Sequence, residues 1–310
     1  MKRLASILLV AAALGSCSKG NTDSPTPPAP PTPSAPSVSL VPAQQIDYIS
    51  KIEYYKVLSG PRRVLSYTYH FEYDDQKRLI SISYREGDGS KWPILYGDRT
   101  ITLLYPGTNE DGGKEEDRLT LTPEGRVSEH STISYKKNKE GVLVKKVDLR
   151  GKDYVYDSEG RQLSYTSTDY FTSTEYSTKS EWKEGNLVKR TYTYPNGNPN
   201  HKTDVSTQEY SSIPNRSFPD LNLLESYIEI GELVSRPYLW SHIKGTRSAK
   251  LISSQAAPLY YDDGKLRGTM YNRWSYKLDT KGRPYDIEIG HFLNDFWDRG
   301  TAYVITYLDK

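Results

Sequence analysis

The sequence is poor in cysteine, in net charge and in long apolar runs. Its single cysteine, Cys17, excludes a disulfide framework and a cysteine-rich zinc site. No apolar run reaches the roughly 20 residues of a membrane-spanning helix, which excludes a multi-span helical membrane protein. The 41 lysines and arginines nearly balance the 39 aspartates and glutamates. Because binding nucleic acid takes a concentrated basic patch, we expect no nucleic-acid partner.

Catalytic and cofactor motifs are also missing. The chain has no HExxH, GxSxG or GxGxxG motif, and its histidines do not pair at metal-ligand spacing. We interpret them as residues of the surface or of strand faces: His70, His130, His201, His242 and His291. The acids of 111–117 lack EF-hand spacing and predict a solvated loop. We therefore expect no metal, no cofactor and no enzyme, although a carboxylate pair for glycoside hydrolysis would come together only in the fold.

The N-terminus has the pattern of a secretory leader. Lys2 and Arg3 give a basic start, the apolar run 4–14 follows, and small residues end it. Without these two basic residues, the remaining chain has as many basic as acidic residues. The pattern predicts a signal peptide over residues 1–16.

The residues Leu14-Gly15-Ser16-Cys17 resemble a bacterial lipobox. The resemblance implies cleavage before Cys17 and acylation of that residue; an ordinary signal peptide with an incidental cysteine is the alternative. Multiple acyl chains anchor a protein stably to a membrane. Only one acid occurs in 18–23, and serine rather than aspartate follows the cysteine. By resemblance to known sorting signals, we expect an outer-membrane lipoprotein, with the periplasmic side slightly favoured over the cell surface.

Residues 17–45 predict a disordered tether. The stretch holds eight of the chain's prolines, and serine, threonine and alanine make up most of the rest. Such a composition buries too little apolar surface to fold, and the prolines keep the chain extended. A proline-rich ligand for an aromatic groove is the alternative. From residue 46 to 310 we expect one β-hairpin domain, with no second linker.

Tyrosine is the most unusual component, with 27 residues. Many tyrosines lie in stretches where apolar and polar residues alternate, which is typical of a half-buried strand with one dry and one wet face. In the segment 67–73, aromatic residues take one face and Thr68, His70 and Glu72 take the other. The alternating runs are 67–73, 80–84, 154–156, 191–194, 285–289 and 303–307.

A recurring turn unit separates these runs. It consists of an aromatic residue, an acid, a short polar stretch often with glycine, and then a basic residue or asparagine before an apolar residue. Asp bonds its own backbone in turns and Gly supplies positive φ, as tight hairpins require. The copies lie at 73–79, 156–163, 182–187, 261–266 and 278–283, with a weaker one at 122–127. They predict an all-β, antiparallel meander of about twelve or more strands, either a strongly curved sheet or an open, flattened barrel.

One region departs from the strand pattern. Between residues 220 and 230, apolar side chains recur every three or four positions, and Asn222 with Glu225 has the spacing of a capping box. We expect one short helix near 220–230 that covers one end of the sheet, although 227–230 also fits a strand. The flanking stretches 195–220 and 235–258 are expected to be rich in loops.

At this point the chain resembles a known family. The lipobox, the turn units and the segments 220–222 and 245–251 resemble uncharacterised Bacteroidetes lipoproteins described as having a porin-like fold. The turn units also resemble the YD-type repeats of large toxin-carrier shells. The family resemblance implies a meandering sheet that curls towards a barrel, and it implies no activity and no binding residues.

A membrane-embedded barrel is disfavoured, because charged residues such as Glu72 and Lys189 fall in mid-strand on the outward-facing candidates. A soluble barrel of twelve or more strands leaves a lumen, a plug or an open sheet. A tyrosine-lined lumen would be amphipathic. Trp240, Trp274 and Trp297 are candidate ligand-binding residues at its rim, with sheet packing as the alternative.

Three hypotheses of function remain. The first is a non-enzymatic, lipid-anchored envelope protein that binds or scaffolds, with a glycan or an envelope protein as partner. The second is a glycan-directed hydrolase of the envelope, and the third is an adhesin-like surface protein. A carboxylate pair about 5–9.5 Å apart in a cleft favours the hydrolase, and an aromatic cavity without such a pair favours binding.

Overall fold

The computed structural model divides the chain into two units, 1–33 and 34–310, and every described residue belongs to the second unit. The predicted leader (1–16) and tether (17–45) lie outside the described residues and stay predictions. The described residues are 46–58, 62–84, 91–105, 114–170, 172–195, 202–224, 245–260, 265–294 and 296–308.

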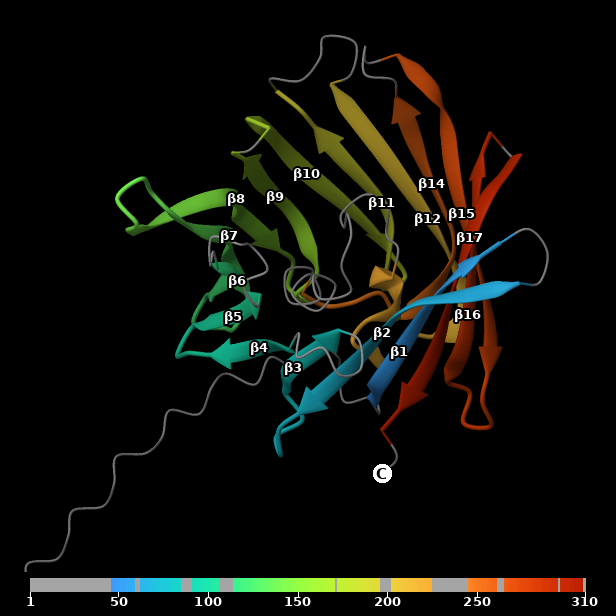
Figure 1. Ribbon diagram of the computed structural model, residues 1–310. Helices are drawn as coiled ribbons and strands as arrows, with labels where there is room; N and C mark the ends of the chain where they lie inside the picture. The colour runs from blue at the N-terminus through green and yellow to red at the C-terminus, as the bar shows by residue number, and fades with distance from the viewer. Residues whose placement is uncertain are drawn as a thin grey trace, which may run out of the picture. The chain divides into compact units, whose positions relative to one another are not determined.

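The described residues form a closed antiparallel β-barrel of 16 strands, each paired with its neighbour in sequence (Figure 1). The barrel closes at the first strand, where Tyr54 pairs with Tyr67 on one side and with Tyr303 on the other. The strands are β1 (Asp47–Val57), β2 (Arg63–Tyr73), β3 (Leu79–Tyr84), β4 (Lys91–Tyr96), β5 (Thr100–Tyr105), β6 (Lys114–Leu121), β7 (Val127–Lys137), β8 (Leu143–Tyr156), β9 (Gln162–Asp169), β10 (Thr174–Lys183), β11 (Asn186–Thr193), β12 (Thr203–Pro214), β14 (Lys250–Tyr260), β15 (Leu266–Leu278), β16 (Pro284–Leu293) and β17 (Phe296–Tyr307). The two-residue β13 (Ser217–Phe218) runs parallel to the start of β1. The all-β meander is confirmed, and it closes instead of remaining open or flattened.

Alternation along each strand decides which side chains face the lumen. On β2, Tyr69 and Phe71 are 3% and 4% exposed, whereas Glu72 lies on the exposed outer face. Their partners on the neighbouring strands β1 and β3, Ile52 and Ile82, are also buried and belong to the same apolar cluster. The predicted dry face is therefore the inner face. The alternating runs named above fall in strands, except that Tyr194 lies one residue past the end of β11.

The outer face carries ion pairs between strands, and the sequence prediction that Glu72 lies in mid-strand was wrong, because it is the next-to-last residue of β2. Lys91 Nζ lies 2.5 Å from Glu72 Oε2, and Lys189 Nζ lies 2.8 Å from Glu181 Oε1. A charged side chain at the lipid face of a membrane barrel costs about 2–4 kcal/mol near the bilayer midplane. Glu72 and Lys189 lie on the outer face, as the sequence predicted.

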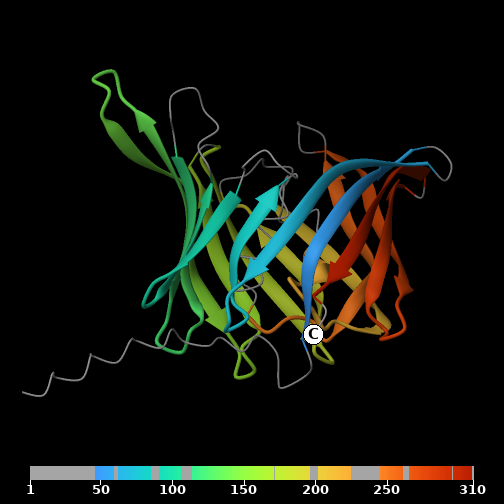
Figure 2. The same ribbon diagram turned by 60° about the horizontal axis from the view of Figure 1, so that its bottom comes forward.

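The two ends of the barrel differ (Figure 2). The turn end, at the bottom of Figure 2, collects the short turns 74–78, 97–99, 122–126, 157–161, 184–185 and 279–283. The opposite loop end includes the turn between β7 and β8. All predicted turn units are turns of the turn end, except the copy at 261–266, which lies partly outside the described residues.

The turn unit has a repeated geometry, seen clearly at 157–161. Asp157 Oδ1 accepts hydrogen bonds from the backbone N–H groups of Glu159 and Arg161, both at 2.9 Å, and its Oδ2 accepts one from Arg161 Nε at 2.6 Å. Gly160 has φ +80°, which a residue without Cβ adopts freely. The turns at 74–78 and 279–283 repeat the Asp–Arg contacts.

Aromatic side chains contact the arginines of several turns and so connect these turns to neighbouring strands. The arginine of a turn lies over a ring near the end of a nearby strand, with the guanidinium carbon 4.4 to 5.9 Å from the ring centroid. The pairs are Arg78–Tyr96, Arg126–Tyr156, Arg161–Trp182 and Arg283–Tyr307. Polar atoms of these and similar rings donate to backbone carbonyls near the start of the adjacent strand: Tyr96 to Leu79, Trp182 to Gln162, Tyr210 to Leu187, Tyr276 to Ile252 and Tyr307 to Pro284. Much of the unusual tyrosine content is therefore structural.

The segment 215–224 lies at the turn end and contributes to the core. The predicted helix near 220–230 is a single 3₁₀ turn, η1 (Leu221–Leu223), and residues 225–230 lie outside the described residues. Its N-cap is Asp220 instead of the expected Asn222. The Asn222 side chain instead bonds the backbone of β14, where it accepts from Ile252 N–H at 2.9 Å and donates to the carbonyl of Lys250 at 2.8 Å. Two other expectations were wrong, because β12 and β14 occupy much of the stretches expected to be loop-rich.

Candidate functional site

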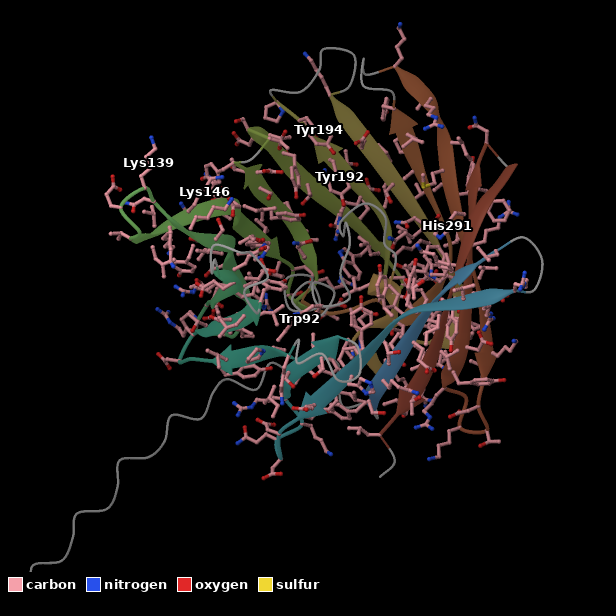
Figure 3. The ribbon with its side chains drawn as sticks, viewed as in Figure 1. Trp92, Lys139, Lys146, Tyr192, Tyr194 and His291 are labelled. Atoms are coloured by element: carbon pink, nitrogen blue, oxygen red, sulfur yellow. The ribbon has the colours of Figure 1, made fainter. Side chains whose placement is uncertain are left out.

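Buried apolar side chains line the lumen on many strands, and the wall formed by β9 to β17 adds a row of buried polar side chains. Strands β2 to β6 present Phe71, Ile82, Trp92, Ile94 and Leu103, which belong to one buried cluster. Figure 3 shows Trp92 directed towards the centre of the barrel. On β9 to β17, a row of buried polar residues faces inward, which we call the polar belt: Gln162, Ser180, Arg190, Ser206, Gln255, Asn272, His291 and Thr301. The lumen is amphipathic, as a tyrosine-lined barrel predicted.

The polar belt is linked by hydrogen bonds from strand to strand. Arg190 donates to Ser180 Oγ at 3.3 Å and to Gln162 Oε1 at 3.2 Å. Further along, His291 Nδ1 lies 2.8 Å from Asn272 Oδ1. These partners arise from register, because residues directly opposite each other across neighbouring strands share a face.

Three buried polar atoms of this wall have no hydrogen-bond partner. They are Gln162 Nε2, Gln255 Oε1 and Trp274 Nε1. Gln162 is fully buried, Gln255 is 3% exposed and Trp274 is 8% exposed. A buried polar group without a partner costs about 1–3 kcal/mol, and native structures satisfy nearly all of them with protein, water or ligand. These atoms mark places where a bound group would complete the hydrogen bonding.

A cavity of about 240 Å³ lies on the same wall, between β11, β12, β14 and β15. Its lining includes Tyr192, Tyr194, Asp204, Ser206 and Met270. Ser206 connects the cavity to the polar belt, because Gln255 Nε2 donates to its hydroxyl at 3.4 Å. The cavity therefore combines ring faces, hydroxyls, one carboxylate and a thioether.

The cavity tyrosines act as hydrogen-bond donors. Burial raises the pKa of the Tyr194 hydroxyl well above its usual value, and the neighbouring charge of Asp204 raises it further. Tyr194 donates to Asp204 Oδ2 at 3.1 Å. Burial also raises the pKa of Tyr192 well above its usual value. Both phenols therefore stay protonated at neutral pH, and Tyr194 uses its proton to bond Asp204.

The three candidate tryptophans lie in different parts of the chain, and the structure describes the side chain of Trp274 but not those of Trp240 and Trp297. Trp274 lies on the inner face of β15, two residues from Asn272, where it packs in the buried core. Trp240 lies outside the described residues. Trp297 belongs to β17, where its backbone pairs with Phe292, but its side chain lies outside the described part. Among the three, the structure brings Trp274 alone to the polar belt.

Most of the polar belt was missed in the sequence. Alternation separates two faces of a strand but does not say which polar residue lies inside. His291 is 2% exposed and His130 is 5% exposed, so both are interior strand residues. Figure 3 shows His291 on the inner side of the barrel.

Of the acids of 111–117, Glu115, Glu116 and Asp117 lie in β6, which corrects the expected solvated loop for these residues. Glu116 and Asp117 lie in β6 and are 8% and 1% exposed, while Asp111 lies outside the described residues. Asp117 faces the lumen, where it accepts hydrogen bonds from the hydroxyls of Tyr105 and Thr132. The prediction of a loop was wrong because the many charged residues of this segment hide the apolar–polar alternation by which a strand is recognised.

The described residues contain neither a metal-binding cluster nor a membrane-spanning helix. No group of three or more His, Cys, Asp or Glu side chains comes together in an arrangement that would hold a metal ion. Within the same residues, no helix has the length and apolar character to span a membrane.

Comparison with known proteins identifies the fold. No protein-family model and no curated protein sequence matches the chain. A crystal structure of a porin-like protein from Bacteroides vulgatus ATCC 8482 superposes with a TM-score of 0.52 at 16% identity, covering 85% of this chain and 100% of that one. A porin-like protein from Bacteroides uniformis ATCC 8492 gives the same TM-score and identity, covering 84% of this chain and 100% of that one. This barrel has a porin-like fold.

The porin-like fold accounts for the architecture and not for the chemistry of the lumen. At 16% identity the two structures establish the arrangement of strands alone. The short turns at one end and longer connections at the other are common in barrels of this kind. The polar belt and the cavity are features of this chain's own residues.

Proposed function

We propose that this chain is a lipid-anchored protein of the cell envelope that binds a small glycan in its lumen without catalysing a reaction. The leader and the lipobox-like sequence ending at Cys17 support the anchor, and the porin-like neighbours support an envelope location. The location we propose is the outer membrane, with the periplasmic side favoured over the cell surface. We propose no nucleic-acid partner and no cofactor.

The observation that carries the binding proposal is the cavity and its connection to the polar belt at Ser206. Gln255 donates to Ser206 and keeps Oε1 as a buried acceptor without a partner, which a ligand rich in hydroxyl groups would satisfy. Sugar rings also pack against aromatic faces, which the cavity supplies at Tyr192 and Tyr194. A cavity of about 240 Å³ is smaller than the roughly 300–1,000 Å³ of drug-sized sites, which favours one or two sugar rings.

The cavity supports binding more than hydrolysis. A glycosidase needs two carboxyl groups on either side of the scissile bond. Among the described residues that line the cavity, Asp204 is the one carboxylate, and it accepts a hydrogen bond from Tyr194. An aromatic cavity without a carboxylate pair is the arrangement expected of a binding protein and not of a glycosidase.

A glycan array with the chain 34–310 tests the proposal. This unit contains all sixteen barrel strands and their core, so it keeps every contact described above. Binding should also change the fluorescence of Trp274, which lies on the polar belt. The variant Gln255→Leu should weaken binding about tenfold by removing one ligand hydrogen bond. The same substitution at Gln76, an exposed turn residue, is the matched control and should leave affinity unchanged.

The outcomes separate the hypotheses. Uniform failure on the array would contradict the glycan proposal and favour a protein partner. Release of reducing sugar from a bound glycan would favour the hydrolase. Proteinase treatment of intact cells tests the side of the membrane, because a periplasmic protein is protected and a surface protein is cleaved.

A further inference from the structure

The hairpin of β7 and β8 extends beyond the rest of the barrel wall. Within the described residues, β6 begins opposite Tyr135 and β9 pairs no further than Leu149, so the strand residues between these positions pair with each other across the hairpin. Figure 2 shows this hairpin projecting past the loop end of the barrel. We call residues 136–146 the tip hairpin. It belongs neither to the lumen nor to the turn end, and its role is independent of the proposed glycan site.

The tip hairpin is well ordered by its turn. Asn138 N–H donates to the carbonyl of Val142 at 2.9 Å, and Asn138 Oδ1 accepts from the N–H groups of Glu140 and Val142 at 3.1 and 2.9 Å. Gly141 has φ +78°, which closes the turn without strain. The exposed side chains at the tip are therefore held in place by a defined turn.

Three consecutive apolar side chains are exposed at the tip. Val142, Leu143 and Val144 are 59%, 48% and 48% exposed. Because successive side chains of a strand alternate, Leu143 lies on one face of the hairpin and the two valines on the other. Both faces of the tip thus present apolar surface, which is unusual for a projecting element in water.

Lysines surround this apolar surface on both faces. Lys136 pairs with Val144, and Lys137 pairs with Leu143, so each apolar strand residue has a lysine directly opposite. The lysines of the tip hairpin are Lys136, Lys137, Lys139, Lys145 and Lys146, and all are exposed. The one acid of this segment is Glu140. Figure 3 shows Lys139 at the end of this hairpin and Lys146 further along β8.

We infer that the tip hairpin docks on an anionic phospholipid surface. A bilayer of anionic lipid offers phosphates for the lysine ammonium groups and hydrocarbon immediately below for the apolar tip, and long lysine side chains reach the phosphates while their stems stay apolar. Nucleic acid and sulfated glycans offer the charge but no hydrocarbon layer. Apolar surface on both faces fits a tip that enters the interface end-on, not one lying flat on it.

Vesicle sedimentation with the chain 34–310 tests this inference without any contribution from an acyl chain at Cys17. The wild type should sediment with vesicles of phosphatidylglycerol and phosphatidylcholine, and not with phosphatidylcholine alone. Each lysine near an anionic surface strengthens binding about fivefold. The variant K137Q/K145Q should therefore weaken binding at least tenfold. The control K179Q/K183Q removes the same charge from exposed positions of β10 and should bind as the wild type does.

A second variant separates charge from insertion. Leu143→Ser keeps every lysine but removes apolar surface, and it should weaken binding to the anionic vesicles severalfold, up to about tenfold. Far-UV circular dichroism shows whether each variant keeps the barrel. Equal sedimentation with both vesicle types, equal loss in the K179Q/K183Q control, or binding unchanged by both tip variants would overturn the inference. So would failure of the wild type to sediment with anionic vesicles, an outcome that leaves an acidic protein groove as the occupant.

Discussion

Replacing Asp157 with alanine removes the hydrogen-bond centre of one turn and should measurably destabilise the barrel. Asp157 accepts two backbone hydrogen bonds at 2.9 Å and one from Arg161 Nε at 2.6 Å. Net contributions are about 1 kcal/mol for a neutral bond and about 1.5–3 kcal/mol for a buried charged one. Because the two side chains are 18% and 20% exposed, solvent screens the ion pair, and we discount it to about 1 kcal/mol.

The expected loss is about 2–3 kcal/mol in the free energy of unfolding of Asp157→Ala. For a domain of this size, each kcal/mol lowers the Tm by about 2–4 °C, so the Tm should fall by about 5–10 °C. Asp157→Asn keeps an oxygen for the backbone bonds and should lose only about 1 kcal/mol. Thermal melts followed by circular dichroism, with urea unfolding as a second measurement, give both values.

Asp98→Ala is the matched control for this experiment. Asp98 is an exposed residue of the β4–β5 turn at the same end of the barrel, so its replacement should shift the Tm by less than about 1 °C. A Tm of Asp157→Ala within about 1 °C of the wild type, or an equal loss in Asp98→Ala, would refute the assignment of the Asp–Arg turn as a stabilising unit.

Three further predictions follow from the same structure. Burial raises the pKa values of Asp74, Asp157 and Asp279, but hydrogen bonds from the arginine of each turn outweigh burial and hold them below the usual value. A depressed folded-state pKa stabilises the fold above the unfolded pKa of about 4, so the Tm should fall as the pH drops below about 4, and the triple Asn variant should fall less. Gly245→Ala should lower the Tm by several degrees, because its φ is +68° and a Cβ would lie 2.1 Å from a carbonyl of the β8–β9 turn. The Cys17→Ala variant should be absent from the acylated membrane fraction in cell fractionation. Unchanged palmitate labelling of this variant would contradict the lipobox prediction.

Local patterns predicted the local structure well. The alternation of 67–73 identified a strand and its dry face, because a half-buried strand repeats its environment every two residues. Asp157 through Arg161 identified a turn, because the side chain that stabilises the turn lies within it. These signals are confined to a few neighbouring residues, so the sequence alone is enough to recognise the strand and the turn.

Closure and the polar belt depend on contacts that no local pattern carries. The pairing of β1 with β17 joins residues more than 240 positions apart, so the sequence left a curved sheet and a barrel as alternatives. Ser206 and Asn272 look like ordinary wet-face residues, because alternation does not say which face becomes the lumen. The expected capping role of Asn222 was wrong for a related reason, since its side chain bonds the distant β14 backbone while Asp220 caps the 3₁₀ turn.

Protection of a lumen thiol by ligand tests the central claim most directly. In the chain 34–310, which lacks Cys17, the variant Ser206→Cys places a single thiol where the cavity meets the polar belt. A glycan that binds in the lumen should slow labelling of this thiol by a maleimide at least tenfold, and the dose dependence should match the binding curve. A glycan that binds the wild type yet leaves the labelling rate unchanged would contradict the placement of the ligand in the lumen.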